Sequence, residues 1–206
     1  MIAQIELAML ARLRAAEERL GYRWAMLETY PVDWDEYFKS KGALRSPAAW
    51  VTFAGVTGVE GASFDLRART SFGVAVCARN LRNETATRHG YDGGEGGASE
   101  PGSYQLMLDA AGLLIGDDLG LDIDRLKLAE IGQVEGSKIA ALRQASMWAL
   151  HFTTTIPIAK LTTVDGRLAD FATFHANWDL PPRAIDAGDL PADALADATD
   201  HVELPQ

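Results

Sequence analysis

Residues Phe64–Gly102 read FDLRARTSFGVAVCARNLRNETATRHGYDGGEGGASEPG and carry the clearest structural signal in this 206-residue chain. The alternation of apolar and polar residues at the start predicts a long strand with one packed face and one face that begins in solvent. This strand is expected to carry Arg79, Arg82 and Arg88 toward a flexible, glycine-rich arm at about residues 80–102. An arm of this kind suits contact with another copy of the chain or with a neighbouring subunit.

The residues before this strand predict a helix, a strand and a short capped helix. Apolar side chains recur every three or four positions over residues 2–20, which is typical of an amphipathic helix, and Gly21 is expected to end it. The aromatic-rich segment Tyr22–Tyr30 predicts a strand. Asp33 is expected to cap the helix that follows, which should stop near Gly42.

One further strand, a hairpin and a helix complete the predicted core. Pro47–Ala54 is apolar on both faces and predicts a central strand, followed by a mobile loop at Gly55–Ala62. Arg125–Gln133 and Ala140–Ile156 are expected to form a closing hairpin, and Ser103 to cap a helix. The core-facing stripe of that helix is expected to comprise Tyr104, Met107, Leu108, Ala111, Leu114 and Ile115, with Leu106 and Leu113 on the far side.

These elements predict an α+β fold, with an antiparallel or mixed β-sheet of about five strands and helices packed on one face. Residues 1–156 are expected to form the core domain, including the flexible arm. Residues 157–206 are expected to form an acidic, irregular extension, because prolines and aspartates increase there and periodicity fades. Such an extension would lie on the domain or on a neighbour.

Composition limits the classes of function. The net charge is −10, and residues 160–206 contribute −6 of it, so the chain lacks the basic excess that a nucleic-acid-binding surface needs. No apolar run reaches the roughly 18 residues of a membrane span, and the N-terminus does not resemble a signal peptide. A single cysteine, Cys77, excludes an internal disulfide and is expected to be a structural thiol. The chain is therefore expected to be made in a cytoplasm.

No part of the sequence predicts a catalytic centre, a cofactor site or a metal site. The four carboxylates of Asp117–Asp124 lack the order of an EF-hand and are typical of a polar loop after a helix. The four histidines show no zinc-hydrolase spacing, and no serine lies in a nucleophile-elbow motif. The sequence therefore favours an assembly protein over an enzyme. A small enzyme using the Asp117–Asp124 cluster is the more remote alternative.

The candidate partner-binding residues are Arg79, Arg82, Arg88, His89, Tyr91 and Trp178. For the arginines two interpretations remain open. They could form exposed ion pairs with Glu84 or other nearby acids, each worth less than about 1 kcal/mol. Alternatively they could contact a neighbouring subunit, since arginine is enriched at interfaces and pairs with carboxylates in a bidentate geometry.

Several blocks of the chain resemble a family encoded in the tail-gene cluster of Mu-like phages and prophages. The blocks cover most of the chain and include no catalytic signature. They are MIAQIELAMLARLRAA, LGYRWAMLETYPVDWDEYF, LRSPAAWVTFAG, VAVCARNLRNETATRHG, GSYQLMLDAAGLLIGDDLGL, NWDLPP and LPADALADATDHVEL.

The family is similar in layout to phage tail terminator proteins, small α+β proteins that form a hexameric ring. The resemblance implies a structural virion protein at the head-proximal end of the tail, assembled in the host cytoplasm. It implies a homohexamer that caps the tail tube, contacting the tail tube protein on one side and a head–tail connector or stopper protein on the other. Another head–tail joining or tail completion protein is the alternative within the same particle.

Overall fold

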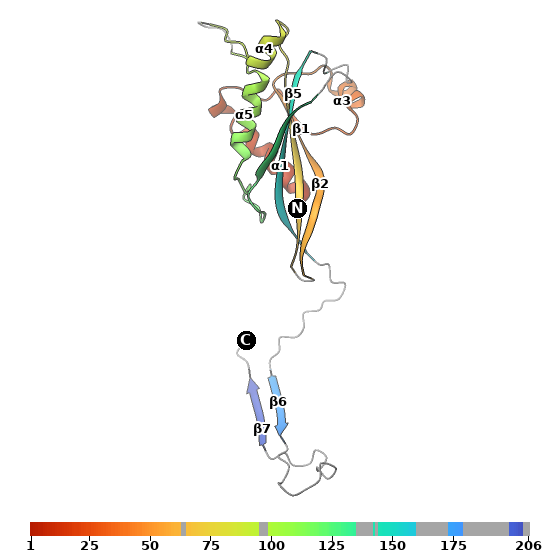
Figure 1. Ribbon diagram of the computed structural model, residues 1–206, viewed down its shortest axis with the longest axis vertical. Helices are drawn as coiled ribbons and strands as arrows, with labels where there is room; N and C mark the ends of the chain where they lie inside the picture. Colours follow the sequence, from red (N-terminus) through yellow and green to blue (C-terminus); the bar gives the residue numbers. More distant parts are fainter. Residues whose placement is uncertain are drawn as a thin grey trace. The chain divides into compact units, whose positions relative to one another are not determined.

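The computed structural model describes residues 1–62, 65–94, 99–134, 142, 144–159, 173–178 and 198–203. The chain divides into two compact units, Met1–Lys160 and Leu161–Gln206. The first unit is an α+β domain built on a five-stranded mixed sheet, which confirms the predicted fold class (Figure 1). Among the described residues, no helix is long and apolar enough to span a membrane.

The strand order in the sheet is β1-β2-β3-β5-β4. β1 pairs with β2 in parallel, and the other three pairings are antiparallel. β2, β3 and β5 are much longer than β1 and β4, so one end of the sheet consists of three strands alone. The strands are β1 (Met26–Thr29), β2 (Ala48–Ala62), β3 (Asp65–Ala78), β4 (Lys127–Val134) and β5 (Ser146–Ile158).

The two long helices, α1 (Ile2–Ala15) and α5 (Ser103–Leu114), pack on one face of the sheet. In α1 the predicted periodicity buries Ile5, Met9 and Leu13 completely. The short α2 (Glu17–Leu20) then ends at Gly21, whose φ of 75° is the left-handed conformation that glycine adopts at low cost. These helices and the facing residues of β3, from Ala68 to Ala78, form the main core.

A smaller core lies on the second face, around the fully buried Trp50 of β2. It is covered in part by α3 (Trp34–Lys41), in which Tyr37 Oη accepts a hydrogen bond from Trp50 Nε1 at 3.1 Å. Asp33 caps α3 as predicted, since its carboxylate accepts from the N–H groups of residues 35 and 36 at 2.8 and 3.0 Å. β2 is therefore covered on both faces where it was predicted to be central.

The predicted mobile loop at Gly55–Ala62 is wrong, because these residues continue β2 and pair with β3. Register shifts at Phe53/Gly55 and Val56/Gly58 mark β-bulges. Gly55 and Gly61, at φ of 125° and 107°, adopt conformations that side chains disfavour. Gly55 therefore accommodates the first bulge, whereas Gly61 lies beyond both bulges, near the end of the strand.

The predicted details of the second long helix also need correction. Gly102, not Ser103, is the N-cap residue of α5, and the Ser103 hydroxyl instead hydrogen-bonds Ser146 Oγ at 2.8 Å. The core-facing stripe is rotated from the predicted one: Leu106 is fully buried, whereas Leu108 is 63% exposed. The N-terminal part of the predicted strand Tyr22–Tyr30 is likewise absent, since β1 begins at Met26.

The second unit contains two strands that the sequence did not predict. β6 (Thr173–Trp178) and β7 (Ala198–Glu203) pair antiparallel over six residues each. Trp178 occupies the register position opposite Ala198.

Candidate subunit-contact site

The contact turn, residues Arg79–Asn83, follows the end of β3 and is held by buried polar side chains. Asn80 Oδ1 accepts a hydrogen bond from the backbone N–H of Arg82 at 2.9 Å, which closes an Asx turn. The N–H of Asn80 donates to the hydroxyl of Thr87 at 3.0 Å. Asn80 is 8% and Thr87 2% exposed, so the base of the turn is fixed inside the domain. Leu81 nevertheless remains 85% exposed.

The short helix α4 (Glu84–His89) positions two of the candidate residues. Asn83 caps it by accepting from the N–H of Ala86 at 2.7 Å. Arg88 forms an i,i+4 ion pair with Glu84. Because β3 ends at Ala78, the helix rather than a strand carries Arg88 and the exposed His89.

The neck of the glycine-rich arm is the pairing of residues 90–91 with residues 100–102. The N–H of Tyr91 donates to the carbonyl of Glu100 at 2.9 Å, and the reverse bond is 2.8 Å. A Cβ atom on Gly102 would lie 2.2 Å from the backbone nitrogen of Gly90. The two backbones therefore pass at a distance that only glycine permits. Within the predicted arm at about 80–102, the described residues form the turn, α4 and the neck, and residues 95–98 lie outside the described part.

Glu100 ties the neck to the contact turn. Its Oε2 atom accepts from Asn80 Nδ2 at 2.7 Å and lies 3.1 Å from a guanidinium nitrogen of Arg82. The Arg82 guanidinium carbon also lies 3.8 Å from the centroid of the Tyr91 ring, a cation–π contact worth about 0.5–1 kcal/mol at an exposed site. Arg82 and Tyr91 therefore orient each other. The ion pairs expected under the first interpretation are present for Arg82 and Arg88, and a contact with a neighbour stays a prediction.

Arg79 differs from the other two arginines. Its backbone N–H donates to Ser46 Oγ at 3.1 Å, while its side-chain Nε is buried and has no hydrogen-bond partner among the described residues. The side chain lies between two surface hollows of about 260 and 710 Å³, which share Ser46, Arg79, Asn80 and Glu100 as lining residues. Leu81 and Arg82 line the larger one. Arg79 therefore lines a surface hollow beside the exposed Leu81.

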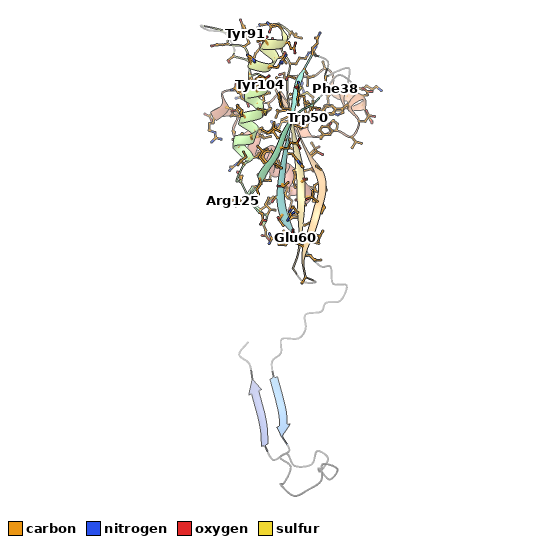
Figure 2. The ribbon with its side chains drawn as sticks, in the orientation of Figure 1. Phe38, Trp50, Glu60, Tyr91, Tyr104 and Arg125 are labelled. Atoms are coloured by element: carbon orange, nitrogen blue, oxygen red, sulfur yellow. The ribbon has the colours of Figure 1, made fainter. Side chains whose placement is uncertain are left out.

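The structure thus brings Arg79, Arg82, Arg88, His89 and Tyr91 to one end of the first unit. Figure 2 shows Tyr91 at this end and Glu60 at the other. His89 lies beside Tyr104 of α5, with ring centroids 5.6 Å apart. The sixth candidate, Trp178, belongs to the second unit.

Sequence reasoning missed Asn80 and Glu100. An asparagine just after a strand is typical of an Asx turn, so Asn80 had a local signal. Glu100 had none, because its partners Asn80 and Arg82 are 20 and 18 residues away in the chain.

The acidic segment Asp117–Asp124 stabilises its own loop. Asp117 pairs with Arg12 and accepts from the N–H of Leu119 at 2.8 Å. Asp118 accepts from the N–H of Gly120 at 2.9 Å. Asp124 pairs with Arg67 at 3.3 Å. Within the described ranges, no group of three or more His, Cys, Asp or Glu side chains has the geometry to hold a metal ion.

One family model matches the chain. It is described as Bacteriophage Mu, Gp37, and the match spans residues 1–156. The matched region ends two residues before β5 does, so it coincides with the first structural unit. No curated protein matches the chain.

Proposed function

The chain belongs to the Bacteriophage Mu Gp37 family, and on that premise we propose that it is a tail terminator. The family is a phage tail-module family, and the chain is a phage structural protein associated with the virion. In the proposal, copies of the chain form a homohexameric ring at the head-proximal end of the tail. The ring caps the tail tube protein and offers its other face to a head–tail connector or stopper protein.

The observation that supports the proposal is that the family match covers the unit whose contact turn and neck form an ordered, exposed surface. Residues 1–156 include the contact turn, α4 and the neck. Leu81, 85% exposed, stands between Arg79 and Arg82 on a turn whose base is buried. Arginine is enriched at protein–protein interfaces, and here two arginines flank an exposed apolar side chain on a rigid support.

The chemistry of the domain supports a structural role over a catalytic one. Three of the four carboxylates of the acidic segment, those of Asp117, Asp118 and Asp124, form loop hydrogen bonds or ion pairs. Cys77 is fully buried, and burial raises the pKa of its thiol to about 12, which makes it a poor nucleophile at neutral pH. We therefore propose that the chain acts by binding, with no reaction of its own.

Electron microscopy of particles produced without this gene tests the proposal. Overlong tails of variable length beside detached heads are expected, because nothing then stops growth of the tube. Tails of normal length beside tailless heads would instead identify a head–tail joining protein. Intact virions would contradict both roles.

A pair of matched variants tests the contact turn in the same assay. Leu81→Asp places a charge at the apex of the turn, and Leu108→Asp places one on an exposed leucine of α5. We expect Leu81→Asp to reproduce the defect of the missing gene and Leu108→Asp to complement it. Thermal unfolding of both purified variants shows whether each remains folded. Equal complementation by the two variants would exclude the turn as a contact.

A further inference from the structure

The sheet of the first unit has two open edges among the described residues. β1 covers β2 only from Ala48 to Val51. Beyond Val51, the backbone N–H of Phe53 is hydrogen-bonded within the subunit, because it donates to Glu6 Oε1 at 2.7 Å. From there to Ala62, no described residue pairs with β2 on the side away from β3. At the opposite edge, β4 pairs with β5 alone.

The open part of β2 exposes apolar side chains, since Val56 and Val59 are 52% and 57% exposed there. The β-bulges, which ordinarily protect an edge, end at Gly58, and from Val59 to Ala62 the strand pairs with β3 in regular register. Figure 1 shows β2 and β5 running past the ends of α1 and α5, so these helices leave this part of the sheet uncovered. Unpaired backbone groups beside exposed valines form a template for an added strand.

We propose that β4 of one copy pairs antiparallel with the open edge of β2 in the next copy, so that the sheet continues between subunits. The inference rests on the proposed ring and names its subunit contact. β4 already runs antiparallel to β2, because three antiparallel pairings separate them. A copy related by rotation about an axis along the strands therefore presents β4 in the required direction.

The apolar side chains of the two edges match in one register. Val59 pairs with Ala68 and Leu128 pairs with Phe152, and both partners face the main core. Val59 and Leu128 therefore lie on the same face of the sheet. Antiparallel pairing that sets them opposite each other brings an exposed valine against a half-buried leucine.

The same register sets Glu60 opposite Lys127. Their partners Arg67 and Thr153 occupy the second face, so the two charged residues share that face. Glu60 contacts Arg69 within its own subunit, yet its side chain remains 71% exposed and can pair with a second cation. Opposite charges directly across two strands favour this register over one that is shifted by a residue.

The offset between the two edges agrees with a closed ring. Glu60 pairs with Arg67 of β3, which in turn pairs with Pro157 of β5. Lys127 pairs with Thr153 of β5, four positions before Pro157. Four positions correspond to roughly 14 Å along the strands, and four strand spacings to roughly 19 Å across them. The strands would then tilt by roughly 35° from the ring axis, close to the tilt of about 35–45° in closed sheets. The contact joins two unlike surfaces, as a ring requires.

Cysteine cross-linking in assembled tails tests this pairing. Cys77 is the chain's one native cysteine and is buried, so introduced thiols react over a low background. Glu60→Cys/Lys127→Cys places two thiols directly opposite each other, and oxidation is expected to give a ladder of linked subunits on a non-reducing gel. Neither single variant should form a ladder. The control pair Glu60→Cys/Lys39→Cys moves the second thiol to an exposed lysine of α3 and should not form one either.

Three other outcomes of the cross-linking experiment would each contradict the pairing or the proposed function. Dimers from Glu60→Cys alone would show a symmetric contact between two β2 edges and overturn the pairing. No ladder in tails that contain the chain would also overturn it, while leaving the proposed function intact. Absence of the chain from tails would overturn the proposed function and this inference together.

A charge exchange tests the register independently of disulfide geometry. Glu60→Lys sets two lysines against each other and is expected to lower complementation at least tenfold. Adding Lys127→Glu restores opposite charges and should return complementation to the level of the unmodified chain. Failure of the double variant to rescue, with both proteins folded, would overturn the proposed register.

Discussion

At position 102 the backbone of the neck passes so close to the chain before it that a methyl group has no room. A Cβ on Gly102 would lie 2.2 Å from Gly90 N and 2.3 Å from the carbonyl oxygen of Arg88. The φ of Gly102 is −84°, so crowding rather than backbone conformation requires glycine here. Gly102→Ala is therefore expected to lower the free energy of unfolding by about 1–3 kcal/mol. Chemical denaturation measures this change.

Gly112 of α5 provides the matched control. Apart from the backbone of its own helix and its chain neighbours, no atom lies within 4 Å of the position that its Cβ would occupy. Because glycine weakens a helix interior relative to alanine, Gly112→Ala is expected to raise the free energy of unfolding by about 0.5–1 kcal/mol. A loss of stability at both positions would contradict the crowding argument at the neck.

Burial of Cys77 has a consequence for the pH dependence of stability. Burial raises the pKa of its thiol from 9.0 to about 12. Above pH 9 the unfolded chain loses this proton while the folded chain keeps it, so stability falls as pH rises. By pH 10 the loss is expected to be about 1.4 kcal/mol relative to Cys77→Ala. Denaturation of both proteins at pH 8 and pH 10 measures it. Equal pH dependence in the two proteins would contradict the shift.

At the scale of elements, the rotation of α5 makes a measurable difference between two leucines. Leu106 is fully buried against the main core, and Leu108 is 63% exposed. Leu106→Ala is expected to lower the free energy of unfolding by about 2–5 kcal/mol, because it removes buried side-chain atoms and leaves a cavity. Leu108→Ala should change stability by less than about 0.5 kcal/mol. Thermal unfolding of the two variants compares these losses. A larger loss of stability from Leu108→Ala than from Leu106→Ala would contradict the observed orientation of α5 and favour the stripe predicted from the sequence.

The same helix shows what the sequence could and could not predict. Its existence follows from local periodicity, but leucines and other apolar residues occur all around it, so more than one stripe fits the pattern. Packing against β3 and β5 selects the side that carries Leu106. In α1, the three charged residues Glu6, Arg12 and Arg14 all lie off the stripe, although Leu7 is exposed as well, and the predicted burial of Ile5, Met9 and Leu13 is confirmed.

For the strands and the contact turn as well, the sequence predicts local structure but not the contacts between distant segments. The strand after Pro47 was predictable from its apolar residues, whereas its continuation through Gly55–Ala62 depends on pairing with β3 that no local pattern shows. The contact turn contains a local signal in Asn80. Its link to Glu100 arises only when the neck closes.

For the whole molecule, the first unit presents dissimilar surfaces at separate places. The contact turn with Leu81 and the arginines lies at one end, and the open edge of β2 lies toward the other. In the proposed ring, a subunit contacts its neighbours through two unlike surfaces and the tail tube and connector through others. If the open edges of the sheet bind neighbouring subunits, the contact turn is free to bind the tail tube or the connector. Leu81→Asp should therefore impair attachment to the tail, while Glu60→Cys/Lys127→Cys in the same chain still links subunits in rings that are not attached to tails.

The division of the chain predicts that residues 1–160 fold without the rest. This fragment contains both cores and the complete five-stranded sheet. Its midpoint of thermal unfolding is therefore expected to match that of the full chain. Residues 161–206 contain nine acidic and two basic residues, so removing them changes the net charge from −10 to −3. A smaller charge weakens repulsion between molecules, and the fragment should precipitate at lower concentration. A lower unfolding midpoint at equal concentration would instead show that the extension stabilises the core.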